Sequence, residues 1–248
     1  MTLHVRPSPP LYLKLGQEID RYTLRRRLNH GWEGTAYLCE EKDTGIRRVI
    51  KFYRPKRAYS IKQRLLNVAR NCDALAGTNV FATYHHMGQL DWRGGELHYL
   101  VFDFIEGPHL YAKMKGSLWR KDWKPLEALE TLCRMSEKLA KAHTLGIALG
   151  DWGLGNNVIL KHEYDPIWID GSHGSANKPY RDYYGDWVTL LHLASRLKAR
   201  RPRSARLNEI YEWLYDWSGE HFSRSTFANI HEGFKHFTEL TRKFCAKN

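Results

Sequence analysis

Polar residues at the ends of two short apolar runs, within segment 143–171, most constrain how this chain can fold. The runs are Val158–Leu160 and Ile167–Ile169. Asn156 and Asn157 precede the first run, Asp170 follows the second, and Asp151 lies in the loop before the asparagines. This order predicts the end of a helix, a tight polar loop, a strand, a turn, a second strand and an acidic residue. Carboxylate and amide groups at such loop ends can bind a hard cation or accept a proton, so they form the candidate site.

The length and composition of the chain are those of an ordinary globular protein. With 248 residues, of which 42% are hydrophobic, it can form one large domain or two small lobes with a real core. It contains no run of about 18 apolar residues, so we predict no transmembrane helix. Its first residues lack the apolar core of a signal peptide. The 4 cysteines are scattered without a C-x-x-C pair, so we predict neither a disulfide framework nor a zinc site. A reducing cytoplasm is the expected location.

The charge of the chain favours anionic partners. The sequence has 39 Lys and Arg against 27 Asp and Glu, a net charge of +12. Nucleotides, phosphate, nucleic acid and acidic lipid headgroups all fit this charge, which does not choose among them. The basic segment Lys198–Arg206 is typical of a solvated turn, and contact with an anionic surface or substrate is its functional alternative.

The first half of the chain predicts an antiparallel sheet with one helix. Prolines near the N-terminus indicate a loosely structured extension over residues 1–20. A glycine-bearing turn at 29–34 lies between the first two predicted strands, and a hairpin turn at 43–45 follows the second. The predicted strands are 22–24, 35–39, 48–53, 80–87 and 97–102, and the predicted helix is 58–76.

Two adjacent histidines, His85 and His86, fall within the strand predicted at 80–87. Side chains alternate between the two faces of a strand, so these two would point in opposite directions. We therefore do not expect them to bind one ion together.

The second half predicts mainly helices. Apolar residues at helical spacing mark 125–143, where Pro125 suits a first-turn position. Asp186 is placed to cap a helix over 187–197. Two or three further amphipathic helices are predicted, at about 207–217 and 223–245. The boundary between the two halves is predicted near Phe104–Gly107.

A lysine follows the glycine-bearing turn on a predicted strand. Glycines let backbone N–H groups approach an anion closely, although a plain hairpin turn is the simpler interpretation of residues 29–34. Lys51 lies in the strand predicted at 48–53. Alternation of side chains points it away from the strand's other apolar face. A lysine in this place can reach phosphate groups.

The order and spacing of these parts, over about residues 22–195, resemble the protein-kinase-like superfamily. The family's G-x-G-x-x-G-x-V loop is matched with Asn29 at the first Gly and Ala36 at the Val. Arg48–Lys51 resembles the V-A-I-K strand. Asp151 takes the position of the catalytic Asp, and Asp170 that of the Asp in D-F-G.

The resemblance implies an α+β, bilobal protein-kinase-like fold that uses ATP and Mg²⁺. It implies an N-terminal extension at 1–20, an antiparallel β-sheet N-lobe with one helix at 21–106, and a mainly helical C-lobe at 107–248. Asp186 resembles the structural Asp that anchors the C-lobe.

The resemblance also implies a role for each candidate residue. Lys51 would neutralise the α- and β-phosphates, and Asp151 would orient and deprotonate the acceptor hydroxyl. The metal would bind Asp170 and one asparagine, for which loop length favours Asn156 and the following strand favours Asn157. The nucleotide would contact Asn29, Gly31, Gly34, Ala36, Val49, Lys51, Phe102 as gatekeeper, Asp103 and Ile105.

Several departures from the family pattern narrow the comparison. Leu149 and Gly150 stand in place of the His and Arg of H-R-D. The segment from Gly171 to Gly185 is short and has no A-P-E, which resembles the RIO-type protein kinases and the Kdo/heptose kinases of bacterial lipopolysaccharide. The helix glutamate that holds the lysine is also missing. Its replacement is Asp73, or more weakly Gln63, Asn67 or Asn71, unless the lysine is held otherwise or activity is impaired.

Three functions therefore stay open. The first is an atypical Ser/Thr protein kinase that moves the γ-phosphoryl group of ATP to a hydroxyl. The second is a sugar kinase acting on an anionic glycolipid, which suits the basic charge and the short segment. The third is a pseudokinase that serves as a binding or scaffold module.

Overall fold

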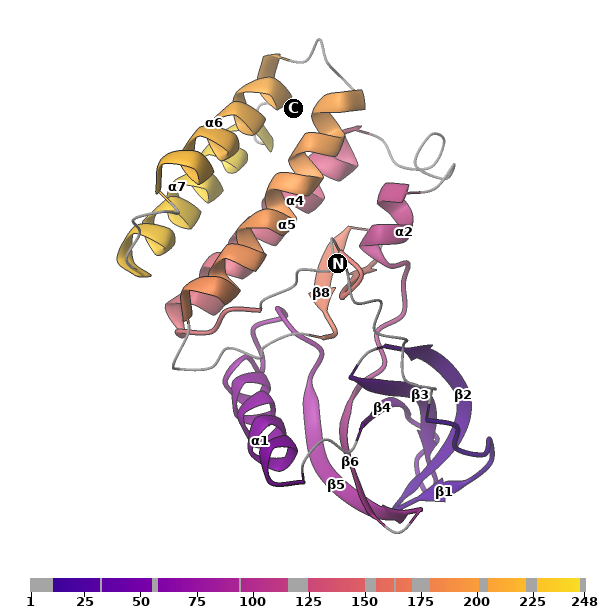
Figure 1. Ribbon diagram of the computed structural model, residues 1–248. Coiled ribbons are helices and arrows are strands. Elements are labelled where there is room, and N and C mark those ends of the chain that lie inside the picture. Colours follow the sequence, from indigo (N-terminus) through magenta and orange to yellow (C-terminus); the bar gives the residue numbers. More distant parts are fainter. Residues whose placement is uncertain are drawn as a thin grey trace, which may run out of the picture. The chain divides into compact units, whose positions relative to one another are not determined.

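Two compact units make up the chain in the computed structural model (Figure 1). The first unit comprises Met1–Asp73 and Thr83–Phe104, and the second comprises Ala74–Ala82 and Ile105–Asn248. The structure describes residues 11–31, 33–54, 58–93, 95–115, 125–149, 155–162, 164–170, 179–200, 205–221 and 227–245.

A six-stranded antiparallel sheet dominates the first unit, with strand order β1-β2-β3-β4-β6-β5. The strands are β1 (Glu18–Ile19), β2 (Tyr22–His30), β3 (Gly34–Glu41), β4 (Arg47–Tyr53), β5 (Tyr84–Trp92) and β6 (Gly95–Asp103). Each predicted strand of this half is present, and β5 begins later than the predicted 80–87 because Phe81 instead bridges to Trp168 in the second unit.

One face of this sheet, here called the outer face, carries an apolar core. Its members include Tyr22, Leu24, Ile50, Phe52 and Tyr99, each with an exposed fraction of 0%. Successive residues of β4 alternate between buried core positions and the opposite, inner face, as the pleat of a strand requires.

The chain before β1 belongs to this core. Leu11 and Leu13 are buried in it, and their backbone N–H groups donate hydrogen bonds to Thr35 Oγ1 and Tyr37 Oη at 3.2 and 3.0 Å. Tyr37 Oη in turn donates to the carbonyl oxygen of Leu11 at 2.7 Å. The expectation of a loose extension is therefore wrong for residues 11–20, because Leu11, Leu13 and Ile19 join the apolar core of the sheet.

One helix accompanies the sheet, α1 (Ala58–Ala74). It buries Ile61, Leu65, Val68 and Cys72, which recur at helical spacing. The chain turns after α1 at Gly77, whose positive φ of 71° is the left-handed conformation that glycine adopts without a steric penalty.

The second unit is mainly helical. Four long helices pack together, with α4 (Pro125–Thr144) against α7 (Phe227–Cys245), and α5 (Pro179–Arg200) against both α4 and α6 (Ala205–His221). A shorter helix, α2 (Leu110–Lys115), also belongs to this unit. Trp187, Trp213 and Phe237 meet at the centre of this packing, with ring centroids 5.7–6.0 Å apart.

A small hairpin, β7 (Val158–Lys161) with β8 (Asp165–Trp168), completes the second unit. The segment before α2 lies along it, since Leu160 N donates to Pro108 O at 2.9 Å. Gly107 permits this approach, because a Cβ there would meet Leu160 O at 2.2 Å. The predicted combination of an antiparallel sheet with one helix, followed by mainly helical structure, is confirmed. Within the described part of the chain, no helix combines the length and apolar character needed to cross a membrane.

Candidate active site

Candidate nucleotide-binding residues gather on the inner face of the sheet. Ala36 pairs with Lys51 across β3 and β4, and Lys51 pairs with Leu100 across β4 and β6. In the next row, Val49 pairs with Phe102. Directly opposed residues of neighbouring strands point to the same face. Ile50 and Phe52, on either side of Lys51, enter the apolar core of the outer face. This confirms the prediction that Lys51 points away from the strand's other apolar face.

The glycine-bearing turn between β2 and β3 is held close to the end of β4. Gly31 N donates to Gly34 O at 2.8 Å, and Arg54 N donates to Glu33 O at 2.8 Å. A Cβ on Gly34 would meet the carbonyl oxygen of Phe52 at 1.8 Å. Gly34 is therefore required by the close approach of two strands. A Cβ on Gly31 meets nothing within 4 Å.

Glu33 in this turn is a carboxylate that faces Lys51. Its Oε2 lies 3.8 Å from Lys51 Nζ, and its Oε1 lies 2.8 Å from Nη2 of Arg64 on α1. Sequence reasoning sought a partner for Lys51 on the helix and missed Glu33. The helix presents a cation to this cluster, while Asp73 lies exposed near the end of α1. Gln63 Nε2 and Asn67 Oδ1 contact each other at 3.4 Å.

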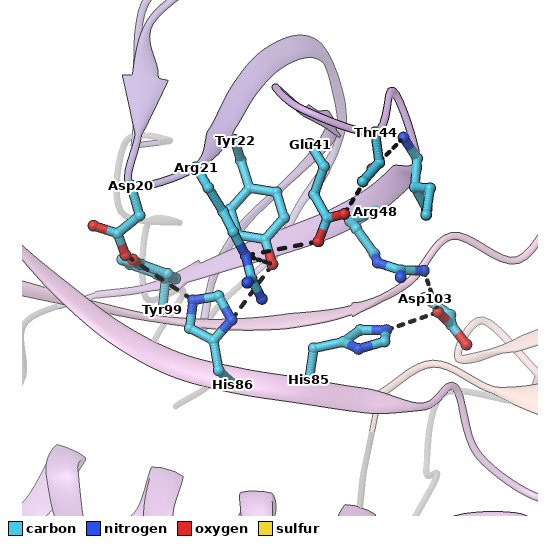
Figure 2. Close-up of polar contacts among 11 residues, drawn as sticks. Asp20, Arg21, Tyr22, Glu41, Thr44, Arg48, His85, His86, Tyr99 and Asp103 are labelled. Atoms are coloured by element: carbon cyan, nitrogen blue, oxygen red, sulfur yellow. Dashed lines mark hydrogen bonds and ion pairs between the residues drawn. The ribbon is translucent and has the colours of Figure 1, made fainter.

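Asp103, predicted to contact the nucleotide through its backbone, sends its side chain to the outer face (Figure 2). Its Oδ1 lies 2.6 Å from Arg48 Nη1 and 2.8 Å from His85 Nε2. Burial alone would raise the pKa of Asp103. Hydrogen bonds from His85 and Thr83 and the charges of His85 and Arg48 outweigh burial, so its pKa is lower than usual. Ile105, the next predicted contact, begins the second unit and is half-buried.

His85 and His86 lie side by side on the outer face (Figure 2), so the prediction of opposite faces is wrong. The register of β5 against β6 shifts between Tyr84 and His86, which inserts one extra residue into the strand. A bulge of this kind breaks the alternation that the prediction assumed. His85 contacts Asp103, whereas His86 stacks on Tyr22 with ring centroids 5.6 Å apart.

His86 belongs to a second polar group on the outer face, with Asp20, Tyr22 and Tyr99 (Figure 2). Tyr99 Oη donates to Asp20 Oδ2, and Tyr22 Oη lies 3.4 Å from His86 Nδ1. Burial is the main reason that the pKa of His86 is lowered and that of Tyr99 raised. In the described ranges, no group of three or more His, Cys, Asp and Glu is arranged to hold a metal ion.

In the second unit, the open end of the β7–β8 hairpin brings the predicted metal ligands close along the backbone. Ile169 N donates to Asn157 O at 2.8 Å, directly before Asp170. Asn157 and Asp170 are half-buried, whereas Asn156 is exposed and its carbonyl oxygen lies 3.0 Å from His109 Nδ1. Asp151, the predicted base, lies outside the described residues, as do Gly150 and Gly171.

Asp186 is buried inside α5 and does not cap it, because the helix begins at Pro179. Its Oδ2 accepts hydrogen bonds from the backbone N–H of Leu149 at 2.9 Å and lies 2.9 Å from His143 Nε2. Asp186 thereby ties Leu149, the last described residue before the candidate loop, to α4 and α5. Sequence analysis gave His143 no part in this contact. Its signal was a histidine among apolar positions at the end of α4.

Comparison with known proteins identifies the fold. No protein-family model matches the chain, and no curated protein is similar enough in sequence to count as a match. A double mutant of the PknI kinase domain from Mycobacterium tuberculosis is 20% identical, with a TM-score of 0.67, covering 94% of this chain and 99% of that one. The PAN3 pseudokinase from Neurospora crassa is 16% identical, with a TM-score of 0.63, covering 93% of this chain and 66% of that one.

The chain therefore has a protein-kinase-like fold, as its sequence predicted. At this level of identity the matches establish the fold alone. The likeness to RIO-type and Kdo/heptose kinases stays a prediction.

Proposed function

We propose that this protein is an ATP- and Mg²⁺-dependent phosphotransferase that moves the γ-phosphoryl group of ATP to a hydroxyl, as an atypical Ser/Thr protein kinase. The observation that carries the proposal is the placement of Ala36, Val49 and Phe102 in the same two rows as Lys51, on the inner face of a kinase-like sheet. This arrangement combines apolar side chains with the cation of Lys51.

The chemistry of the inner-face residues supports nucleotide binding. Ala36 and Val49 are small, so a flat base can lie against the strands, and Phe102 is only 4% exposed and would bound its inner edge. Asn29, Gly31 and Gly34 would cover the phosphates with the turn. Lys51, with 12% of its side chain exposed, would neutralise the α- and β-phosphates, and the backbone at Asp103 and Ile105 would contact the base.

The second unit fits a hard cation through oxygen donors at the end of the β7–β8 hairpin. Asp170 and either Asn157 or Asn156 would hold Mg²⁺, and Asn157 is the better placed because its backbone is tied to Ile169. Bound Mg²⁺ would supply charge neutralisation at the phosphates. Asp151 would accept the proton of the acceptor hydroxyl, which makes it a general base.

Nucleotide binding is tested by the thermal unfolding of the full chain with ATP, with and without Mg²⁺. We expect stabilisation that grows with Mg²⁺ and that Asp170→Asn and Lys51→Met each reduce. Phosphoryl transfer is tested with labelled ATP, as self-labelling or transfer to a generic Ser/Thr substrate, and Asp151→Ala should abolish it. No stabilisation by ATP under any condition would refute the Mg-ATP site, and transfer that survives Asp151→Ala would refute the base assignment.

A pseudokinase is the second candidate, and the positive charge that α1 carries near Lys51 favours it. The helix presents Arg64 instead of a carboxylate to the cluster around Lys51, unlike the family pattern. A pseudokinase would bind nucleotide, or only keep the fold, without transferring phosphate. A chain that is stabilised by ATP but shows no labelling of any acceptor would support this function.

The charge and the cysteines of the chain bear on the phosphate acceptor and on the location of the protein. A sugar kinase acting on an anionic glycolipid suits the net charge of +12, and the basic segment Lys198–Arg206 would contact such a surface. We propose that the activity is cytoplasmic, in keeping with Cys39, Cys72 and Cys133 being buried and outside any disulfide. Comparing transfer to a protein substrate with transfer to a lipopolysaccharide-core sugar would separate the two acceptor classes.

A further inference from the structure

We propose that Lys51 and Arg64 form a two-cation phosphate site, and that Glu33 is a built-in anion that occupies this site until phosphate displaces it. The proposal rests on the proposed function for the identity of the ligand, a nucleoside di- or triphosphate. It adds Arg64 as a ligand-binding residue and gives Glu33 a competing role.

The geometry places one carboxylate between two cations from different elements. Glu33 Oε1 lies 2.8 Å from Arg64 Nη2, and Oε2 lies 3.8 Å from Lys51 Nζ. The side chains of Lys51, Glu33 and Arg64 are 12%, 25% and 31% exposed, so all three are largely withdrawn from water. A carboxylate that bridges a lysine and an arginine uses the same donors that a phosphate would use.

Hydrogen bonds hold the backbone at Gly31, Glu33 and Gly34, so phosphate would compete with the side chain of Glu33 and not with its backbone. Backbone hydrogen bonds of 2.8 Å join Gly31 to Gly34 and Arg54 to Glu33. The contact of Gly34 with Phe52 holds the same stretch against β4. Displacement of the carboxylate therefore requires rotation about side-chain bonds only, and the glycine turn keeps its place.

Charge decides the direction of the competition. Glu33 places one negative charge between the cations of Lys51 and Arg64. A phosphate group brings more negative charge and more acceptor oxygens than a carboxylate, and the planar guanidinium of Arg64 can donate two parallel hydrogen bonds to it. Phosphate binding is then favoured, although it must displace Glu33.

Neutral substitutions at the two positions should have opposite effects on phosphate affinity. Glu33→Gln removes the competing charge, so ADP, ATP and inorganic pyrophosphate should bind more tightly, by roughly tenfold. Arg64→Gln removes one of the two cations and should weaken the same ligands by roughly tenfold, while Arg64→Lys should retain part of the affinity. Adenosine lacks phosphate, so its affinity should not change in any variant.

The experiment is isothermal titration of the full chain with adenosine, ADP, ATP and pyrophosphate. Arg70→Gln is the matched control, because Arg70 is exposed on the same helix and its loss changes net charge equally. Circular dichroism and thermal unfolding check that each variant is folded. Opposite shifts for Glu33→Gln and Arg64→Gln, with Arg70→Gln like the wild type, are the expected result.

Three results would overturn the inference. If Glu33→Gln weakens phosphate ligands as Arg64→Gln does, Glu33 positions Lys51 and does not compete. If Arg64→Gln binds like Arg70→Gln, Arg64 is no part of the site. If pyrophosphate binds neither the wild type nor Glu33→Gln, no phosphate site exists here. A distinct result, tighter pyrophosphate binding in Glu33→Gln without binding of any nucleotide, would support the inference and refute the nucleotide-dependent function.

Discussion

His143 Nε2 lies 2.9 Å from Asp186 Oδ2, and the structure buries both side chains completely. The same Asp186 oxygen accepts a hydrogen bond from the backbone of Leu149, two residues before Asp151. A residue of α5 thus joins the end of α4 to the chain that leads into the candidate catalytic loop. The imidazole in this contact comes from the last turn of α4.

Breaking this buried contact should destabilise the protein strongly. Asp186→Ala leaves two buried donors without their acceptor, so we expect a loss of about 3 kcal/mol or more in the free energy of unfolding. Urea unfolding measures it. Glu137→Gln, which removes the partner of Arg242 in an exposed ion pair, is the control and should cost less than about 1 kcal/mol. Equal losses in the two variants would contradict the structural importance of Asp186.

Two glycines of the same turn should respond differently to alanine. The Cβ of Gly34→Ala would meet Phe52 O at 1.8 Å, so β3 and β4 must separate locally. We expect a loss of about 1–3 kcal/mol, seen as a lower Tm. Gly31→Ala has open space around its Cβ and should change stability by less than about 1 kcal/mol. A Tm for Gly34→Ala equal to that of Gly31→Ala would argue against the close approach.

The segment before β1 should contribute to the stability of the first unit. Leu11 is 4% exposed and Leu15 is 54% exposed. Leu11→Ala removes buried methyl groups and leaves a cavity, so we expect a loss of about 2–4 kcal/mol, whereas Leu15→Ala should have little effect. Chemical denaturation of the two variants provides the measurement. Similar midpoints would mean that the segment is not part of the core.

The side chain of Asp103 should make stability depend on pH in acid. Burial opposes its ionisation, but hydrogen bonds and cations lower its pKa below the ordinary 3.8, so the folded state binds the proton more weakly than the unfolded state. The stabilisation is complete above the unfolded-state pKa. It is lost as pH falls through the lower, folded-state pKa.

The measurement compares the wild type with Asp103→Asn in urea at several pH values from 7 to below 3.8. The difference in unfolding free energy should be largest near neutral pH and should shrink in acid. Asp43→Asn, in an exposed turn, is the control for the general effect of acid. A difference that is constant with pH would show that Asp103 does not gain stability from its charge.

Local patterns in the sequence predicted much of the fold. Apolar spacing found α4 within one residue of its observed end, and strand alternation placed Lys51 on the correct face. Residues close in the chain carry these signals, because a helix or strand repeats over a few positions. The family resemblance named Ala36, Val49, Lys51 and Phe102 as candidates, and the register of the sheet puts them on one face.

The sequence by itself determined which elements form and which residues are candidates for the site. Only the tertiary structure decided how charged groups pair: Glu33 with Lys51 and Arg64, and Asp186 with His143. It also decided that a bulge in β5 turns His85 and His86 to one face. These relationships join residues distant in the chain or depend on strand register. Periodicity within one segment carries no information about either, because both are set by packing between segments.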